Sequence, residues 1–171
     1  MEDLRLHVYG DPVLRKKAEP VERFDTEIRD LVEQMRRIMR ENSGVGLAAP
    51  QAGVSLRVAV FEIPRENESP LEFVLINPEI VERDGDIEFE EGCLSVPGVF
   101  ERVKRARWVV VKGSDEHGEE HVFEAEGLVA RAVQHEMDHL DGVLFIDRVG
   151  SVRRRLLKRK LREISESTAA G

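Results

Sequence analysis

The segment QHEMDHLDG, at residues 134–142, contains two histidines and a glutamate at a spacing that suits a metal site. His135 and His139 are four residues apart, so on a helix their imidazoles project from one face and can bind one metal ion. Glu136 is the next residue round the helix and can accept a proton from a water that the metal activates, without binding the metal itself. Apolar residues flank the motif, which indicates a buried helix. The pattern predicts metal-assisted hydrolysis.

Two histidines need a third protein ligand to hold a catalytic metal. The peptidase pattern HExxHxxGxxH is matched as far as Gly142, but Phe145 stands where that pattern requires its last histidine. A downstream glutamate would have to be Glu163 or Glu166, both in a basic segment near the end of the sequence. Cys93 is the one cysteine of the chain and lies in the segment EGCLS. Its thiolate with two imidazoles would leave an open position for water or substrate, so we expect Cys93 to be the third ligand.

A third segment, GVGLAAPQ at residues 44–51, combines small residues with a primary amide. Gly44 and Gly46 allow the backbone to approach another strand or a ligand closely. Taken alone, the segment is typical of a tight connection between a helix and a strand. Gln51, however, ends it at the edge of a stretch without charged residues, and a buried amide needs hydrogen-bond partners. Gln51 therefore argues against a purely structural connection.

Together, GVGLAAPQ, EGCLS and QHEMDHLDG resemble the peptide deformylase family, in this order and at these separations, over residues 8–149. The resemblance implies an α+β fold in which the motif helix packs between antiparallel sheets. It also implies a metal-dependent hydrolase that removes the formyl group from the N-terminal formyl-methionine of newly made proteins and releases formate.

The resemblance implies a role for each residue of these motifs. The metal ligands would be Cys93, His135 and His139, and Glu136 would be the general base. The donors to the developing oxyanion would be the backbone N–H of Leu94 and the side-chain amide of Gln51. The backbone of Val45 and Gly46 would pair with the substrate as an added strand.

The resemblance implies Fe²⁺ as the ion bound in the cell, with Zn²⁺, Ni²⁺ or Co²⁺ as substitutes, and a thiolate with two imidazoles accepts each of these ions. Small residues at Gly46 and Gly92 would leave room for a formyl group and exclude acetyl. For the methionine pocket we expect four apolar residues, Val45, Val96, Val129 and Ala132. Arg131 departs from the apolar wall that the resemblance implies, although its long stem can cover apolar surface.

Length, composition and charge limit the class of protein that carries these motifs. The chain has 171 residues, a net charge of −8, 41% hydrophobic and 35% charged residues, enough to bury one core. This charge disfavours DNA as a partner, and the charge-free stretches are too short to span a membrane. The first ten residues lack the basic and apolar pattern of a secretory signal, so we expect a cytoplasmic protein.

Hydrophobic periodicity predicts α+β, because no regular alternation of strands and helices is present. Helices are expected at residues 25–42, with Asp25 as N-cap, at 126–140, and from 151 to about 165. Strands are expected at 56–63, 72–81, 86–91, 105–113 and 120–125, with a hairpin turn at residues 115–118.

The last segment differs in charge from the rest of the chain. Residues 151–171 hold seven basic and two acidic residues. We therefore divide the chain into a catalytic domain, residues 1–150, and a basic C-terminal helix with a frayed tail, residues 151–171. Either this helix only docks on the domain, through Leu156, Leu157, Leu161 and Ile164, or it also binds the phosphate-rich ribosome.

Two other functions share some of these residues. An endopeptidase of the HExxH type would use His135, His139 and Glu136 without needing Cys93. A metal-binding module without catalytic activity would keep the three ligands and tolerate the loss of Glu136. The joint presence of Glu136 and Gln51 favours an enzyme over such a module.

Overall fold

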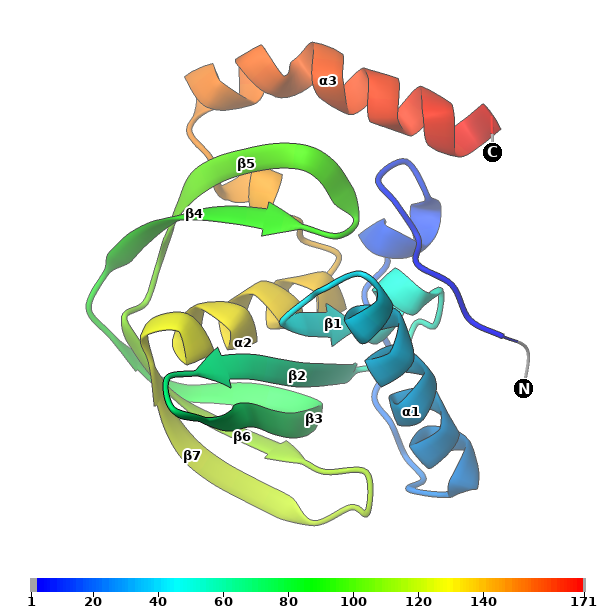
Figure 1. Cartoon of the computed structure of the whole chain (residues 1–171), viewed down its shortest axis with the longest axis vertical. Coiled ribbons are helices and arrows are strands. Elements are labelled where there is room, and N and C mark those ends of the chain that lie inside the picture. Colours follow the sequence, from blue (N-terminus) through cyan, green and yellow to red (C-terminus); the bar gives the residue numbers. More distant parts are fainter. Residues whose placement is uncertain (1–2, 171) are drawn as a thin grey trace.

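An antiparallel sheet with the strand order β1-β2-β3-β6-β7 forms the centre of the fold in the computed structural model, which describes residues 3–170 (Figure 1). Its strands are β1 (Gly46–Ala48), β2 (Val58–Arg65), β3 (Glu68–Asp84), β6 (Trp108–Ser114) and β7 (Glu120–Glu126). A separate antiparallel pair consists of β4 (Ile87–Cys93) and β5 (Val96–Arg105). The helices are α1 (Thr26–Glu41), α2 (Gly127–Leu140) and α3 (Ser151–Ala170). The predicted α+β class is confirmed.

Strand β2 is buried on both faces over most of its length, and the alternation of its side chains shows how. Val58 and Val60 pack with α1, whereas Ala59, Phe61 and Ile63 pack with α2. Successive side chains of a strand point to opposite faces, so a strand between two helices reads as a continuous apolar run. The uninterrupted run in β2 therefore places α1 and α2 on opposite faces of the sheet.

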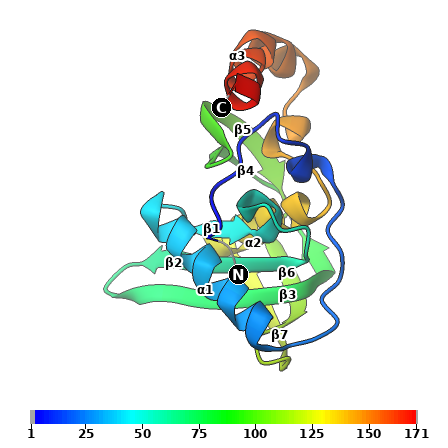
Figure 2. The same cartoon turned by 90° about the vertical axis from the view of Figure 1, so that its right-hand side faces the viewer.

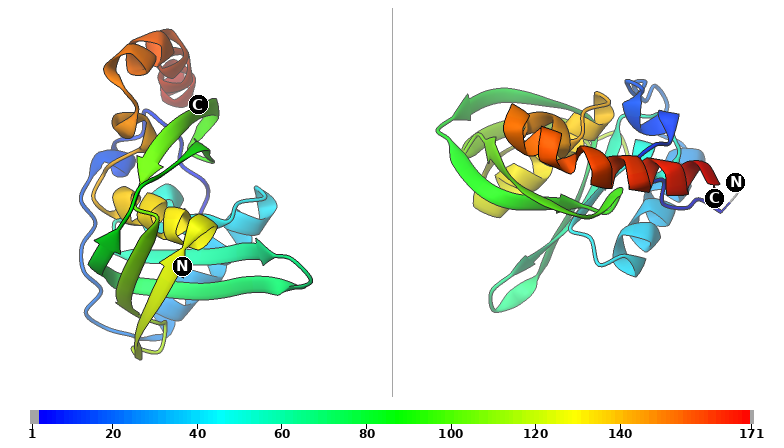
Figure 3. Two further views of the ribbon diagram at one scale, coloured as in Figure 1. Left: turned by 90° about the vertical axis from the view of Figure 1, so that its left-hand side faces the viewer. Right: turned by 90° about the horizontal axis from the view of Figure 1, so that it is seen from above.

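The motif helix α2 lies between the five-stranded sheet and the β4–β5 pair (Figures 1 and 3). Its small residues Ala130, Ala132 and Val133 pack on the sheet. The opposite side of the helix carries polar residues toward β4 and β5. The helix ends before Gly142, whose φ of +74° and close approach to the Arg15 carbonyl suit only glycine. Helix α1 begins as expected, because the Asp25 side chain accepts a hydrogen bond from the Ile28 N–H.

Strands β1 and β5 were not predicted from the sequence. In β5 the buried face consists of Val99, Glu101, Val103 and Arg105, so two inward positions are charged. Glu101 is paired with Arg153 of α3, and Arg105 with Glu91 and Asp138. Buried charges are tolerated because they are paired, but they hide the apolar alternation of the strand.

Helix α3 continues to Ala170, beyond the expected end near residue 165, so the tail is helical and not frayed. The hydroxyl of Thr168 donates to the Tyr9 carbonyl at 2.7 Å, which holds the last turn against the N-terminal segment (Figure 2). Leu161 and Ile164 are buried and Leu157 is partly buried. Leu156 is 65% exposed, so its expected docking is wrong. Among the described residues, no helix combines the length and apolar character that crossing a bilayer requires.

Candidate metal centre and active site

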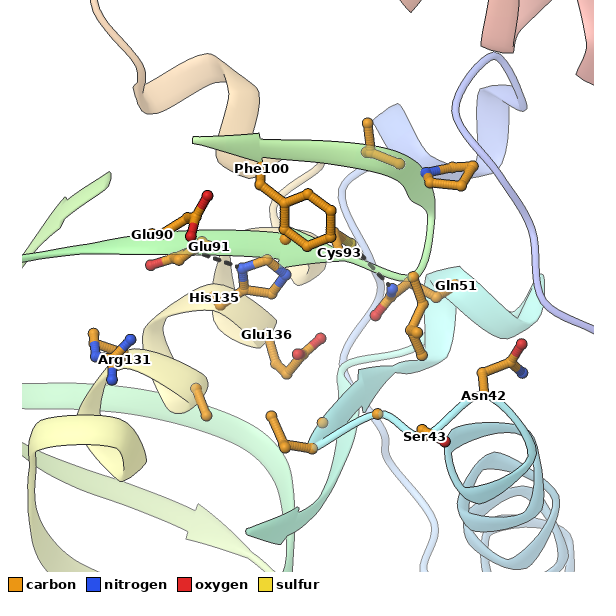
Figure 4. A pocket seen from close by; sticks show the side chains of 18 of the residues that line it. Asn42, Ser43, Gln51, Glu90, Glu91, Cys93, Phe100, Arg131, His135 and Glu136 are labelled. Atoms are coloured by element: carbon orange, nitrogen blue, oxygen red, sulfur yellow. Dashed lines mark hydrogen bonds and ion pairs between the residues drawn. The ribbon is translucent and has the colours of Figure 1, made fainter. Parts of the chain in front are cut away.

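The predicted metal ligands come together although Cys93 is far from the two histidines in the sequence. Figure 4 shows two of them, Cys93 and His135. Cys93 ends β4, and His135 and His139 lie one turn apart on α2. One potential ligand atom of each residue lies within 4.8 Å of the other two. The Cys93 Sγ and His139 Nε2 atoms are 3.4 Å apart. Such a set of a thiolate and two imidazoles is suited to a catalytic metal that keeps one open position.

Glu91 fixes the orientation of one imidazole. Its Oε1 lies 3.0 Å from His135 Nδ1, which leaves His135 Nε2 for a metal. Arg105 donates two hydrogen bonds to Glu91, at 2.6 and 2.9 Å, and a third to Asp138 at 3.0 Å. Burial alone would raise the pKa of Glu91, but hydrogen bonds with His135 and Arg105 and the charge of Arg105 lower it to about 2. Glu91 is therefore a carboxylate that supports the ligand.

The charges around the two histidines favour a cation. Burial would lower the pKa of His135, but the acidic groups of Glu136, Cys93 and Glu91 raise it well above the ordinary value. The same negative groups stabilise a metal ion at this point. Burial, with the positive charges of His135 and Arg105, lowers the pKa of His139. Its imidazole is thus neutral, as a metal ligand must be.

Glu136 is buried beside the ligands, with 4% of its surface exposed. Burial raises its pKa to about 7. Its Oε1 has no hydrogen-bond partner within residues 3–170. The carboxylate packs against Gly46, where an added Cβ would lie only 2.8 Å from Oε2. A carboxylate with a raised pKa and a free oxygen next to a metal site is suited to proton transfer.

Gln51 lies on the other side of Cys93. Its side chain is 1% exposed, and its Nε2 is 3.6 Å from Cys93 Sγ (Figure 4). Leu94 follows Cys93 directly and lines the same cavity. The structure thus places Gln51, Leu94 and Glu136 beside the candidate ligands.

A cavity of about 600 Å³ opens onto these groups. Val45, Val96 and Ala132 line it, as expected for a methionine pocket. Val129 does not, because it packs against the five-stranded sheet, and Leu128 lines the cavity instead. The cavity also has the following residues in its wall: Gly46, Gly92, Phe100 and Arg131.

Arg131 contacts an aromatic side chain through its guanidinium. Its guanidinium carbon is 4.1 Å from the centre of the Phe89 ring. Gly92 faces Phe100, which lines the cavity, since an added Cβ at Gly92 would lie 2.6 Å from the Phe100 ring. The space beside Gly92 is therefore filled by Phe100, and the space beside Gly46 by Glu136.

The sequence did not reveal the polar residues behind the ligands. Glu91 and Ser95 stand inside EGCLS and Asp138 inside the HExxH segment, but nothing in their spacing indicates partners. Arg105 comes from a strand that was not predicted. The sequence offered one signal for them, namely the charged residues Glu91 and Asp138 inside the two motifs that hold the ligands. Glu163, the alternative ligand, lies on α3 and lines a different cavity, so it is not part of the site.

Comparisons with known proteins agree with this arrangement. The family model for polypeptide deformylase matches residues 4–155. A peptide deformylase of Thermodesulfovibrio yellowstonii is 47% identical over 163 residues, 95% of this chain and 98% of that protein. One of Syntrophobacter fumaroxidans is 46% identical over 170 residues, 99% of this chain and 100% of that protein.

Solved structures agree as well. The crystal structure of a peptide deformylase from Legionella pneumophila superposes with a TM-score of 0.86 at 43% identity, and covers 97% of both chains. The chain therefore belongs to the polypeptide deformylase family, hydrolases that remove the N-formyl group from newly made peptides.

Proposed function

We propose that the chain deformylates formyl-methionyl peptides with Glu136 as general base and with Gln51 and Leu94 as oxyanion donors, beside a cation held by Cys93, His135 and His139. The observation that carries this proposal is the meeting of the three ligand atoms within 4.8 Å, with the buried Glu136 carboxylate beside them.

The donor set supports Fe²⁺ as the ion in the cell, with Zn²⁺, Ni²⁺ or Co²⁺ as substitutes. A thiolate and two imidazoles are borderline-soft ligands that accept all four ions. Such an ion, when bound, supplies a water of lowered pKa and polarises the formyl oxygen. The surplus of acidic groups around His135 is the electrostatic reason for a divalent cation here.

Glu136 moves the proton. Its raised pKa allows it to take a proton from the attacking water near neutral pH and to give it to the departing amine nitrogen. Its position against Gly46 keeps the free oxygen near the ligands rather than in solvent.

Gln51 Nε2 and the backbone N–H of Leu94 would donate to the oxygen of the formyl group as it gains charge. Both residues adjoin Cys93 and line the cavity, so the two donors flank the same point. A fixed donor of this kind contributes about 3 kcal/mol to stabilising a transition state.

The substrate backbone would extend the sheet at β1. This strand lies at the sheet edge, and the Val45 carbonyl accepts a hydrogen bond from Glu62 of β2. Backbone groups of consecutive residues in a strand point to opposite edges, so those of Gly46 face the open edge and the cavity. An extended peptide can pair there, while the Val45 side chain contacts it in the cavity.

Formate release from formyl-Met peptides, measured without oxygen beside metal quantification, tests the proposal. Cys93→Ser should lose metal or at least ~100-fold in rate. A near-normal rate of formate release with the metal retained would show that Cys93 is not needed as a ligand. Glu136→Ala should keep the metal and lose turnover. Comparable hydrolysis of formyl and acetyl peptides would contradict the expected exclusion of acetyl substrates.

The charge of the basic C-terminal helix supports the proposal that the ribosome is a second binding partner. Arg155, Lys158, Arg159 and Arg162 are exposed on α3. Alanine at these four positions should weaken binding to ribosomes in a salt-dependent way, with hydrolysis of small formyl peptides unchanged. Deleting the helix is a poorer test, because it would uncover Leu161 and Ile164. Unchanged ribosome binding would contradict the proposal.

We propose the same division of the chain as from the sequence, with a catalytic domain in residues 1–150 and a basic C-terminal segment in residues 151–171. A substrate made on ribosomes supports a cytoplasmic location.

A further inference from the structure

The Gln51 amide is held at both of its ends. Its Oε1 accepts a hydrogen bond from the Ala48 backbone N–H at 3.0 Å. Its Nε2 donates to Ser95 Oγ at 3.1 Å and approaches Cys93 Sγ at 3.6 Å. Gln51 and Ser95 are 1% and 0% exposed, so protein groups and not bulk water satisfy this amide.

The partners of these atoms allow only one direction for each hydrogen bond. The Ser95 hydroxyl lies 2.7 Å from the His7 carbonyl oxygen, which can only accept, so its single proton is committed to His7. Ser95 Oγ must then accept from Gln51, and the group facing it must be the NH₂. The Ala48 N–H can only donate, so the opposite end of the amide must be the oxygen.

The backbone supports the same arrangement. The His7 N–H donates to the Gln51 carbonyl, and the Tyr9 N–H donates to the Ser95 carbonyl, both at 2.7 Å. Residues 7–9 therefore bridge the two segments that carry Gln51 and Ser95. The His7 carbonyl, which accepts the Ser95 proton, is thereby held in a fixed position relative to the Gln51 amide.

We propose that Ser95 is a positioning residue, which keeps the NH₂ of Gln51, and not its oxygen, directed toward the reacting oxygen. One N–H of the amide donates to Ser95 Oγ, and the second donates to Cys93 Sγ at 3.6 Å, on the side of the cavity. A flipped amide would direct a lone pair at the developing oxyanion. The inference rests on the proposed role of Gln51 as an oxyanion donor.

Ser95→Ala removes the acceptor at the NH₂ end of the amide, so that only the Ala48 N–H, at the oxygen end, still holds its orientation. We expect kcat to fall by about 10- to 100-fold, no more than in Gln51→Ala, because the donor is misplaced part of the time. KM and metal content should stay near the wild-type values. In a Gln51→Ala background, Ser95→Ala should change kcat little further, since no amide is left to orient.

Thr168→Val is a matched control, because the Thr168 hydroxyl also donates to a carbonyl of the N-terminal segment at 2.7 Å, but at Tyr9 and away from Gln51. It should lower the melting temperature and leave kcat unchanged. If Ser95→Ala fails to fold, Ser95→Cys keeps a side chain of similar size with weaker hydrogen bonding and should lower kcat in the same direction.

Unchanged kcat in Ser95→Ala, or losses that multiply in the double variant, would overturn the inference. Full kcat in Gln51→Ala would overturn it together with the proposed role of Gln51. A wild-type protein that releases no formate would instead show that the proposed function has failed.

Discussion

Glu91 Oε1 and His135 Nδ1 are 3.0 Å apart, so a carboxylate two residues before the cysteine ligand orients an imidazole on a different element. Arg105 holds this carboxylate with two hydrogen bonds and is itself buried. The metal centre therefore depends on a buried ion pair as well as on its three ligands, and this pair links β4, β5 and α2.

Glu91→Gln should weaken both the metal site and the fold. It leaves the buried Arg105 charge with Asp138 as its remaining partner, which should cost about 2–3 kcal/mol of unfolding free energy. Metal affinity should fall about 10- to 100-fold, because a neutral amide oxygen replaces the carboxylate that orients and charges His135. Chemical denaturation and metal titration measure the two effects. Glu88→Gln is the control, since this exposed glutamate of the same strand pairs with Arg102 on the surface and should cost less than ~1 kcal/mol. Equal effects of the two substitutions would contradict the prediction.

Gly46→Ala should lower turnover without removing the metal. The new Cβ would lie 2.8 Å from Glu136 Oε2, so the carboxylate must shift. A displacement of this size should reduce kcat by about 10- to 100-fold. Steady-state kinetics with metal analysis test this. Gly150→Ala serves as the control, because nothing lies within 4 Å of its added Cβ. A wild-type kcat in Gly46→Ala would show that Glu136 has no fixed position in catalysis.

The thiol of Cys93 should report metal binding independently of activity. It is the one cysteine of the chain and is partly exposed. Alkylation by iodoacetamide should proceed in the metal-free protein and slow by ~10-fold or more when Zn²⁺ or Co²⁺ is added, because coordination occupies the thiolate. His139→Ala should lose most of this protection. Alkylation rates that do not respond to metal would mean that Cys93 is not a ligand.

Asp147→Asn should destabilise the fold in a pH-dependent way. Burial would raise the pKa of Asp147, but the hydrogen bonds from Arg15 and the Leu144 N–H lower it below the ordinary value of 3.8. A lowered pKa means that the carboxylate stabilises the folded state at pH above about 4, and that this stabilisation disappears as the pH falls through the folded-state pKa. The variant should lose about 1.5–3 kcal/mol at pH 7 and approach the wild type in strong acid. Unfolding curves from pH 7 to 2 measure it.

Exposed Asp30 offers the comparison for this experiment, since Asp30→Asn on the surface of α1 should change stability by less than ~0.5 kcal/mol. A pH-independent difference between Asp147→Asn and the wild type would contradict the linkage.

The amino-acid sequence by itself determined the local elements and the chemistry of the ligands. Helical periodicity predicted α1 and the motif helix, because one apolar face repeats every three to four residues in both. The spacing of His135 and His139 fixes their common face for the same local reason. The type of Cys93 made it the best third ligand even though nothing in the sequence placed it near the histidines.

The tertiary structure decided what depends on contacts between distant segments. Strand β5 was missed because its inward Glu101 and Arg105 look like surface residues until their partners on α3, β4 and α2 are known. The direction of each hydrogen bond around Gln51 depends on a contact between His7 and Ser95, which are 88 residues apart in the sequence. The sequence gives the polarity of each side chain. Whether a buried charge or amide has hydrogen-bond partners depends on which groups the fold brings within hydrogen-bond distance.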